Sequence, residues 1–140
     1  MFDITQLATS DTGFLHLKDP STEEPIFVGE GDAQLPVGIT LHAPGSPAYV
    51  TAESKRTNRA LVRSKRKVDL TADLLRSDQV QFFTDITVSF DQLSYPPAEG
   101  ATGEKLFNAL YSDRRYGWIV DQVNAYVSDW GNFSTTSPKN

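Results

Sequence analysis

Cysteine is absent from the 140-residue sequence, and histidine occurs only twice. Without cysteine the chain can form no disulfide framework, no thiolate nucleophile and no cysteine-based zinc site. His16 and His42 are too few to build a catalytic metal centre alone, although two strands could bring them face to face. We therefore expect neither a metal nor another cofactor.

Long apolar runs and a secretory signal are missing as well. The longest stretch without charge, residues 33–52, contains three prolines, which argues against a membrane-spanning helix. Residues 1–3 do not start a secretory signal, which begins with basic residues followed by an apolar segment. Apolar residues make up 39% and charged residues 22%, as in ordinary globular proteins. We expect one soluble, cytoplasmic domain.

Positive charge is concentrated in one segment. Seven of the 13 basic residues lie in residues 55–67 with no acid between them, and without these seven the net charge of −5 would become −12. On a helix, six of them fall within about one third of the circumference. We call these six the basic stripe: Lys55, Arg56, Arg59, Arg63, Arg66 and Lys67. Such a stripe is either a solvated helix face or a binding site for an acidic surface.

The first third of the chain predicts strands. Residues 14–18 and 25–28 flank a turn that begins at Asp19, and residues 37–42 alternate apolar with small or polar side chains. These segments predict a small antiparallel β-element in residues 13–42.

The rest of the chain predicts about four helices. The first spans residues 47–67 with Ser46 as its N-cap, Thr71 and Thr102 cap the second and a short third, and the last spans residues 116–130. Residues 86–90, after the second helix, fit a helix or a strand equally well.

We therefore predict an α+β, mainly helical fold, in which a small N-terminal antiparallel β-element precedes about four helices. Residues 1–133 form a single domain, with its helical part in residues 46–133. Residues 134–140 form a mobile polar tail.

The first predicted helix has an unusual apolar pattern. Small and apolar residues recur at spacings of four and three, opposite the basic stripe. We call them the seam: Val50, Ser54, Thr57, Leu61, Ser64 and Val68. Because three of the six are small and polar, we expect the helix to pack lightly through the seam. It would then extend from the body of the protein or depend on a partner.

Two short motifs resemble functional sequences. Residues 11–13 spell the Asp-Thr-Gly of aspartic proteases, but they lack the preceding apolar strand and following small residue of those enzymes. Residues 29–31 lack the third glycine and the helix of a dinucleotide-binding loop. No nucleophile, base and oxyanion site come together in the pattern, so we expect no enzyme.

Aromatic residues gather near the C-terminus. Residues 111–133 contain six of them, more than one short helix can bury: Tyr111, Tyr116, Trp118, Tyr126, Trp130 and Phe133. Part of this set is therefore a candidate binding surface. The basic stripe contains no aromatic residue to stack on bases, and the acidic remainder of the chain would oppose phosphate. We do not expect nucleic acid as a partner.

The C-terminal part resembles a known family. The runs LYSD at residues 110–113, YGWIVDQV at 116–123 and DWGNF at 129–133 resemble the C-terminal signature of tail assembly chaperones of tailed bacteriophages. In that signature a helix ending in Leu-Tyr precedes an aromatic-x-Trp-Ile-x-x-Gln-Val helix and a closing Asn-Phe. The resemblance covers most of residues 14–133 and is strongest over 102–133.

Earlier segments also resemble motifs of this family, and they occur in the same order along the chain. Residues 19–20 with 24–26 resemble its Pro-x-x-Gly-Glu-Pro hairpin turn. Residues 39–41, then 45–49, then a helix rich in Arg, Asn and Lys also match.

The chain departs from the family pattern at three places. Glu23 stands where the turn normally has glycine, residues 29–36 look like an insertion, and Arg114 replaces a frequent proline. The hairpin and the link between the last two helices are therefore the parts where the structure can differ from the family.

The resemblance implies a non-enzymatic protein of the host cytoplasm that is absent from the mature virion. Such chaperones bind the long, aggregation-prone tape measure protein, keep it soluble and help recruit the tail tube protein. A frameshifted, longer product is common among them.

On this interpretation two surfaces carry the function. We expect Tyr111, Trp118, Tyr126 and Trp130 to contact the tape measure protein, and the basic stripe to dock on the acidic body of a second copy, giving a homo-oligomer. Two other functions stay open: a structural minor tail or tail-completion protein of the virion, and a nucleic-acid-binding accessory protein.

Overall fold

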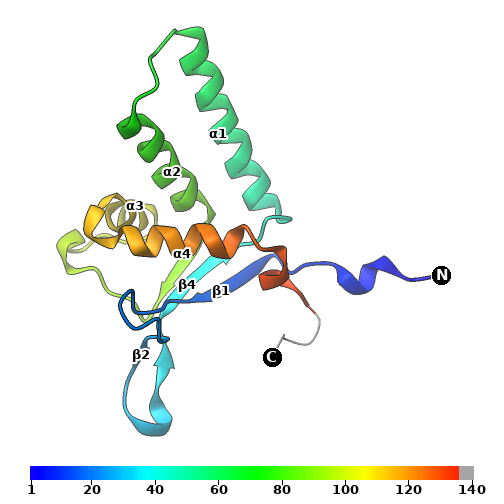
Figure 1. Ribbon diagram of the computed structural model, residues 1–140, viewed down its shortest axis with the longest axis vertical. Coiled ribbons are helices and arrows are strands. Elements are labelled where there is room, and N and C mark those ends of the chain that lie inside the picture. Colours follow the sequence, from blue (N-terminus) through cyan, green and yellow to red (C-terminus); the bar gives the residue numbers. More distant parts are fainter. Residues whose placement is uncertain (136–140) are drawn as a thin grey trace.

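The computed structural model describes residues 1–135 and is mainly helical, with a small antiparallel sheet (Figure 1). The predicted α+β fold class is confirmed. Within the described residues, no helix has both the length and the apolar character needed to cross a membrane.

The sheet has three strands. β1 (Thr12–His16), β4 (Gly38–His42) and β5 (Thr87–Asp91) are paired antiparallel in the order β1-β4-β5. Between β1 and β4, the chain forms a separate two-stranded hairpin of β2 (Phe27–Val28) and β3 (Leu35–Pro36). Figure 1 shows this hairpin projecting beyond one end of the sheet.

Four α-helices complete the described part of the fold. α1 (Pro47–Lys65) and α2 (Ala72–Ile86) form a helical hairpin that extends away from the sheet, while α4 (Gly117–Val127) lies across it (Figure 1). α3 (Glu104–Ser112) packs on α2. The predicted extension of the first helix away from the body is confirmed.

Side-chain capping explains where α1 and α2 begin. The Ser46 hydroxyl accepts a hydrogen bond from the Tyr49 amide at 3.2 Å, and Thr71 does the same for Leu74 at 3.1 Å. The predicted cap at Thr102 is wrong, because Gly103 occupies the N-cap of α3 with a φ of 59°. Glycine adopts this left-handed conformation without the steric cost that a side chain brings.

Residues 86–90, whose sequence fits a helix or a strand equally well, are mainly strand. β5 pairs with β4, so that Phe90 lies opposite Ile39. β-Branched and aromatic side chains favour this extended conformation, and β5 covers what would otherwise be a free edge of β4. The sheet therefore takes its third strand from the part of the chain predicted to be helical.

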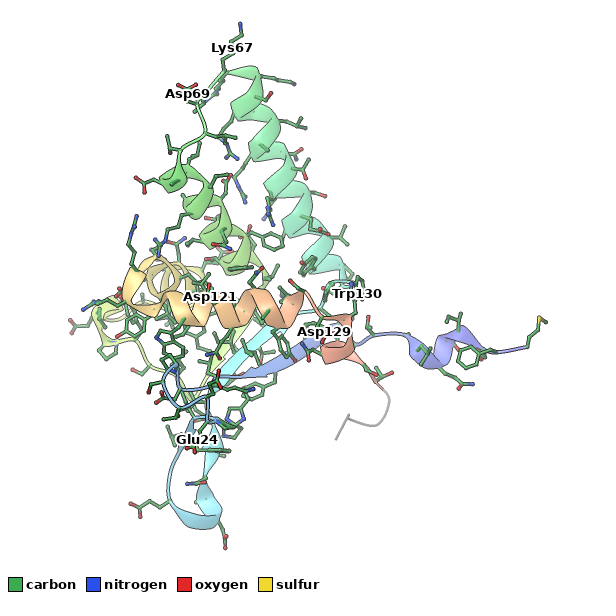
Figure 2. All side chains as sticks on the ribbon, viewed as in Figure 1. Glu24, Lys67, Asp69, Asp121, Asp129 and Trp130 are labelled. Atoms are coloured by element: carbon green, nitrogen blue, oxygen red, sulfur yellow. The ribbon has the colours of Figure 1, made fainter. Side chains whose placement is uncertain are left out.

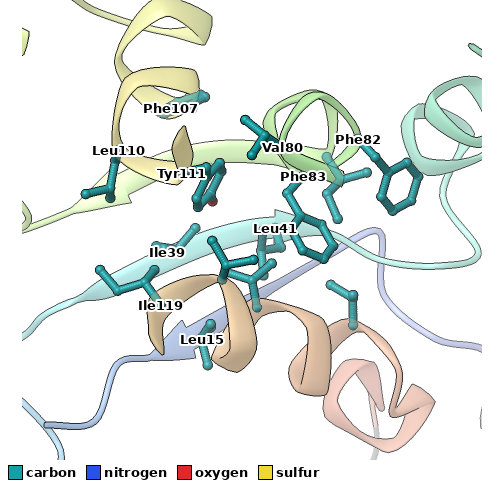
Figure 3. Close-up of a cluster of buried hydrophobic side chains, with 14 of the residues drawn as sticks. Leu15, Ile39, Leu41, Val80, Phe82, Phe83, Phe107, Leu110, Tyr111 and Ile119 are labelled. Carbon is teal, nitrogen blue, oxygen red and sulfur yellow. The ribbon is translucent and has the colours of Figure 1, made fainter. Parts of the chain in front are cut away.

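The core gathers around β4 (Figure 3). Ile39 and Leu41 are fully buried, with Phe83 of α2, Tyr111 of α3 and Ile119 of α4 in the same cluster. Alternate residues of a strand point to the same face, which explains why positions 39 and 41 are buried together.

The last described residues are attached to the N-terminal segment. The Ser10 amide donates to the Phe133 carbonyl at 2.8 Å, and Thr9 forms an isolated antiparallel bridge with Ser134. The Thr135 hydroxyl donates to the Ala8 carbonyl at 3.0 Å. The rest of the predicted tail, residues 136–140, lies outside the described residues.

Asp113 holds the corner between α3 and α4. Its carboxylate accepts hydrogen bonds from the Arg115 guanidinium at 2.9 and 3.1 Å and from the Tyr95 hydroxyl at 2.7 Å. The Arg115 backbone amide also donates to it, which caps the turn at Arg114–Tyr116. The Arg115 guanidinium, followed by the Tyr95 hydroxyl, lowers the pKa of Asp113.

We predict that Asp113→Asn lowers the melting temperature most at neutral pH. Because the pKa of Asp113 is lower in the folded chain, its carboxylate stabilises the fold above the unfolded-state pKa of about 4. That contribution is lost as the pH falls toward the folded-state pKa. Thermal unfolding of both proteins between about pH 7 and about pH 3 should show the difference shrinking with acid. A difference independent of pH would contradict this role of the charge.

Candidate partner-binding groove

A groove of about 770 Å³ lies between α4 and the turn that follows β1. α4 contributes Trp118, Asp121 and Tyr126 to its lining, and the turn contributes Asp19 and Glu23. Two of the four aromatic residues predicted to bind a partner therefore share one concave surface.

The spacing of residues on α4 explains this arrangement. Trp118, Gln122 and Tyr126 follow one another at four-residue intervals, so they lie along one face of the helix. Val123 and Val127 point into the core instead. Trp118 and Tyr126 are half-buried, which leaves part of each ring open to the groove.

Gln122 joins the two walls of the groove. Its side-chain oxygen accepts a hydrogen bond from the Lys18 amide at 2.9 Å, and its side-chain nitrogen donates to the Lys18 carbonyl at 2.8 Å. A side-chain amide thus pairs with the backbone beyond β1 as a neighbouring strand would. This pairing holds α4 at a defined distance from the turn.

The turn itself is organised by Asp19. Its carboxylate accepts from the Ser21 amide and the Ser21 hydroxyl, both at 2.8 Å, and from the Thr22 amide at 3.3 Å. The Ser21 amide, and then its hydroxyl, lower the pKa of Asp19, so the carboxylate stays charged at neutral pH. Glu23 closes the turn with a φ of 61°, the left-handed conformation for which glycine is better suited. Glu23 is also the position where the chaperone pattern has glycine.

The groove is acidic. Asp19, Glu23 and Asp121 line it, against the single positive charge of Lys18. Figure 2 shows Asp121 on the exposed side of α4 and Glu24 close to the turn. Aromatic faces beside carboxylates suit a partner segment that carries both apolar and basic side chains.

Trp130 lies apart from the groove. The predicted last helix continued to residue 130, but α4 ends at Val127, and Trp130 begins a separate 3-10 turn. The Asp129 carboxylate caps this turn by accepting from the Gly131 amide at 2.9 Å. Trp130 is 55% exposed and lies at the foot of α1 (Figure 2), where a Cβ on Gly45 would come within 3.3 Å of its ring.

Tyr111 is a core residue. Its side chain is fully buried, and its hydroxyl lies 2.7 Å from the Thr87 hydroxyl in a hydrogen bond. Burial raises the pKa of Tyr111, so the phenol stays neutral. The prediction that Tyr111 contacts a partner is therefore wrong, because the sheet and α2 cover its ring.

Three residues of the basic stripe pack against α2. Arg63 donates to Asp78 at 3.0 Å and is also ion-paired with it, and the Arg59 Nε lies 3.4 Å from the same carboxylate. The guanidinium of Arg56 lies 4.8 Å from the centre of the Phe82 ring. The hypothesis that these three arginines dock on a second copy is therefore corrected: they hold the helical hairpin together.

The remaining stripe residues are available for other contacts. Lys55, Arg66 and Lys67 are exposed and form no ion pair within residues 1–135. The seam also faces outward, so the expectation that α1 packs through it is wrong. Attraction to Asp78 and Asp85 of α2 brings the opposite, charged face of α1 inward instead.

The other short motifs have structural roles. Gly13, the last residue of the Asp-Thr-Gly motif, lies in β1 against an aromatic ring, and a Cβ there would come within 2.7 Å of Phe133. His16 and His42 lie at opposite ends of the β1–β4 pair, because Thr12 pairs with His42. No group of three or more histidine, cysteine or carboxylate residues suited to a metal occurs among residues 1–135.

The family resemblance seen in the sequence has no support from comparisons with known proteins. No family model, curated protein or solved structure matches this chain. The likeness to tail assembly chaperones is therefore a resemblance of motifs.

Part of the groove lining was not predicted from the sequence. Asp19, Glu23, Asp121 and Gln122 were not among the predicted partner-binding residues, although all four line the groove with Trp118. The four-residue spacing of Trp118, Gln122 and Tyr126 was a usable signal for their shared face. That the turn after β1 faces them was not visible from spacing, because it depends on how α4 crosses the sheet.

Proposed function

We propose that this chain is a tail assembly chaperone of a tailed bacteriophage, which binds the tape measure protein in the host cytoplasm and keeps it soluble. The acidic, aromatic groove beside α4 is the observation that carries the proposal. The motif resemblance supports it, because the Trp and Gln of the signature correspond to Trp118, which lines the groove, and Gln122, which joins its walls.

The groove suits the binding of a short segment of a long partner. Trp118 and Tyr126 offer large contact surfaces that lose little side-chain freedom on binding. Asp19 and Asp121 favour segments that also carry lysine or arginine. Many copies, each covering one segment, would keep the partner from aggregating, and moderate affinity at each site would let the tail tube protein displace them.

We predict that Trp118→Ala combined with Tyr126→Ala abolishes capture of the tape measure protein. Alanine removes the two aromatic contacts, and aromatic residues at the centre of an interface typically account for about 30-fold or more in affinity. Co-expression with the tape measure protein of the same phage, followed by nuclease treatment and co-purification, measures the capture. Leu75→Ala is the matched control, because Leu75 is 55% exposed on α2 and does not line the groove.

The outcomes separate the proposed functions. Soluble co-purification that is lost only in the double variant, with helicity retained, supports the chaperone. Unchanged capture by the double variant removes the groove from the proposal. An insoluble tape measure protein, together with stoichiometric amounts of this chain in purified particles, would indicate a structural protein of the virion instead.

A further inference from the structure

β1 is an edge strand, and its backbone shows which residues face outward. The sheet order places β1 at one end, beside β4 alone. The Asp11 carbonyl accepts from the Ala43 amide at 2.8 Å, just before β1 begins. The Leu17 amide donates to the Val37 carbonyl at 3.0 Å, just after it ends. In an antiparallel ladder these two bonds mean that the odd-numbered residues bond to β4, so the even-numbered ones direct their amide and carbonyl groups away from it. We call that side of β1 its outer edge.

Both ends of the outer edge are paired, whereas its middle is open. At one end, the Ser10 amide donates to the 3-10 turn that follows α4. At the other end, the Gln122 side chain pairs with the backbone of Lys18. Between them, the outward amide and carbonyl groups of Phe14 and His16 have no hydrogen-bond partner within residues 1–135. The outer edge therefore has room for one short strand.

β1 also lacks the features that usually protect the edge of a sheet. Its sequence, TGFLH, contains no proline and no lysine, arginine or carboxylate, and Phe14 is 37% exposed on it. The other edge strand, β5, ends in the charged Asp91 and pairs with β4 through an irregular register. An unprotected edge such as that of β1 is a typical place for a partner to add a strand.

The groove described above follows this outer edge. Leu15 and His16 both line it, although neighbouring residues of a strand point to opposite faces of the sheet. The groove therefore spans the edge of β1 from one face to the other. A strand added there would have Trp118 and Asp121 of α4 on one of its faces.

The opposite face of the same edge is aromatic. The His16 ring lies 6.0 Å from the Phe14 ring and 4.8 Å from the Phe27 ring, measured between ring centres. Phe27 is 47% exposed. The two faces thus suit different side chains, because Asp19 and Asp121 attract basic ones and the aromatic rings pack against apolar ones.

From these observations we infer that the partner segment binds as an added β-strand, which pairs with the outer edge of β1 inside the groove. The segment is extended and alternates basic with apolar side chains. The inference rests on the proposed function for the identity of the partner, the tape measure protein, and adds how the segment is held. A second copy suits the edge less well: antiparallel pairing of two β1 strands about Phe14 would bring Asp11 of each copy close to Asp19 of the other.

A synthetic peptide tests the pairing directly. The probe has about nine residues, alternates lysine with valine and has both ends blocked. On binding, hydrogen exchange of the Phe14 and His16 amides should slow at least about tenfold. The amides of Gly13 and Leu15 already face β4, so their exchange should change less than about twofold.

Modified peptides test the register and the charge. With lysine toward α4, the valine amides face β1, because residues opposite each other in a ladder share a face. N-methylation of the valine amides should therefore abolish binding, whereas N-methylation of the lysine amides should change it less than about threefold. Replacing lysine with glutamate should weaken binding at least about tenfold.

The variant Phe14→Pro tests the same edge on the protein. Edge strands tolerate proline where the amide faces outward, so this variant keeps the bonds to β4 and loses one outward amide. Capture of the tape measure protein should fall at least about tenfold. Phe14→Ala is the matched control: it keeps the amide and removes the ring, and capture should fall less than about fivefold. If Phe14→Pro does not fold, as judged by circular dichroism, the exchange measurement on the unchanged chain decides alone.

The outcomes separate this inference from the proposed function. A lysine-valine peptide that does not bind at up to about 1 mM, or that binds without protecting Phe14 and His16, would overturn the added strand. Capture that is lost in the Trp118 and Tyr126 double variant but unchanged in a folded Phe14→Pro variant would also overturn it and would keep the chaperone. Protection by the peptide without any capture of the tape measure protein would support the strand site and remove the chaperone.

Discussion

Replacing Tyr111 with alanine should destabilise the fold by about 3–5 kcal/mol, the usual cost of removing a large aromatic side chain from a core. Tyr111 is fully buried, and its ring contacts Phe83 and Phe90 edge-on. The variant would leave a cavity at the point where α2, α3 and β5 meet. Urea unfolding followed by circular dichroism measures the change in the free energy of unfolding.

Tyr111→Phe separates the ring from its hydroxyl. The phenylalanine variant keeps the ring and removes one buried hydrogen bond to Thr87, which should cost about 1–2 kcal/mol. If Tyr111→Ala instead weakened partner capture and left stability unchanged, Tyr111 would belong to a binding surface after all. The structure gives the opposite expectation, since no part of this side chain is exposed.

Asp78→Ala should open the helical hairpin, with a loss of about 2–3 kcal/mol. Asp78 is the common partner of Arg59 and Arg63, and its side chain is only 15% exposed. Removing it leaves two positive charges close together without their main counter-charge. A fully buried pair costs about 3–5 kcal/mol to break in this way, and partial exposure reduces that cost.

Hydrogen exchange locates the effect of Asp78→Ala. Amide protons in α1 should lose protection, while those in β4 should keep it, because the hairpin extends away from the sheet (Figure 1). Asp69→Ala is the matched control: it removes an exposed carboxylate at the hairpin tip that forms no ion pair within the described residues. Equal loss of protection in both variants would argue against a specific role for Asp78.

Charge reversal in the basic stripe should disrupt the helical hairpin. The double variant Arg59→Glu, Arg63→Glu changes two residues of the stripe that contact α2. Since both arginines contact Asp78, that variant would bring three carboxylates together and separate α1 from α2.

The sequence by itself determined the local structure of much of the chain. Ser46 and Thr71 cap their helices as predicted, because capping depends on a side chain and an amide three residues apart. The α+β class and the strand at 37–42 followed from the period of the apolar residues, which reflects the backbone geometry of each element. Trp118 and Tyr126 were identified because the number of aromatic residues exceeded what a short helix can bury.

Only the tertiary structure decided which face of each element is covered. Periodicity shows that α1 has a charged face and an apolar face, but Asp78 and Asp85 of α2 determine that the charged face points inward. In the same way, residues 86–90 became a strand because β4 offered a free edge, and Tyr111 became core because β5 lies over it. These outcomes depend on contacts between residues far apart in the chain, and such contacts leave no trace in local spacing.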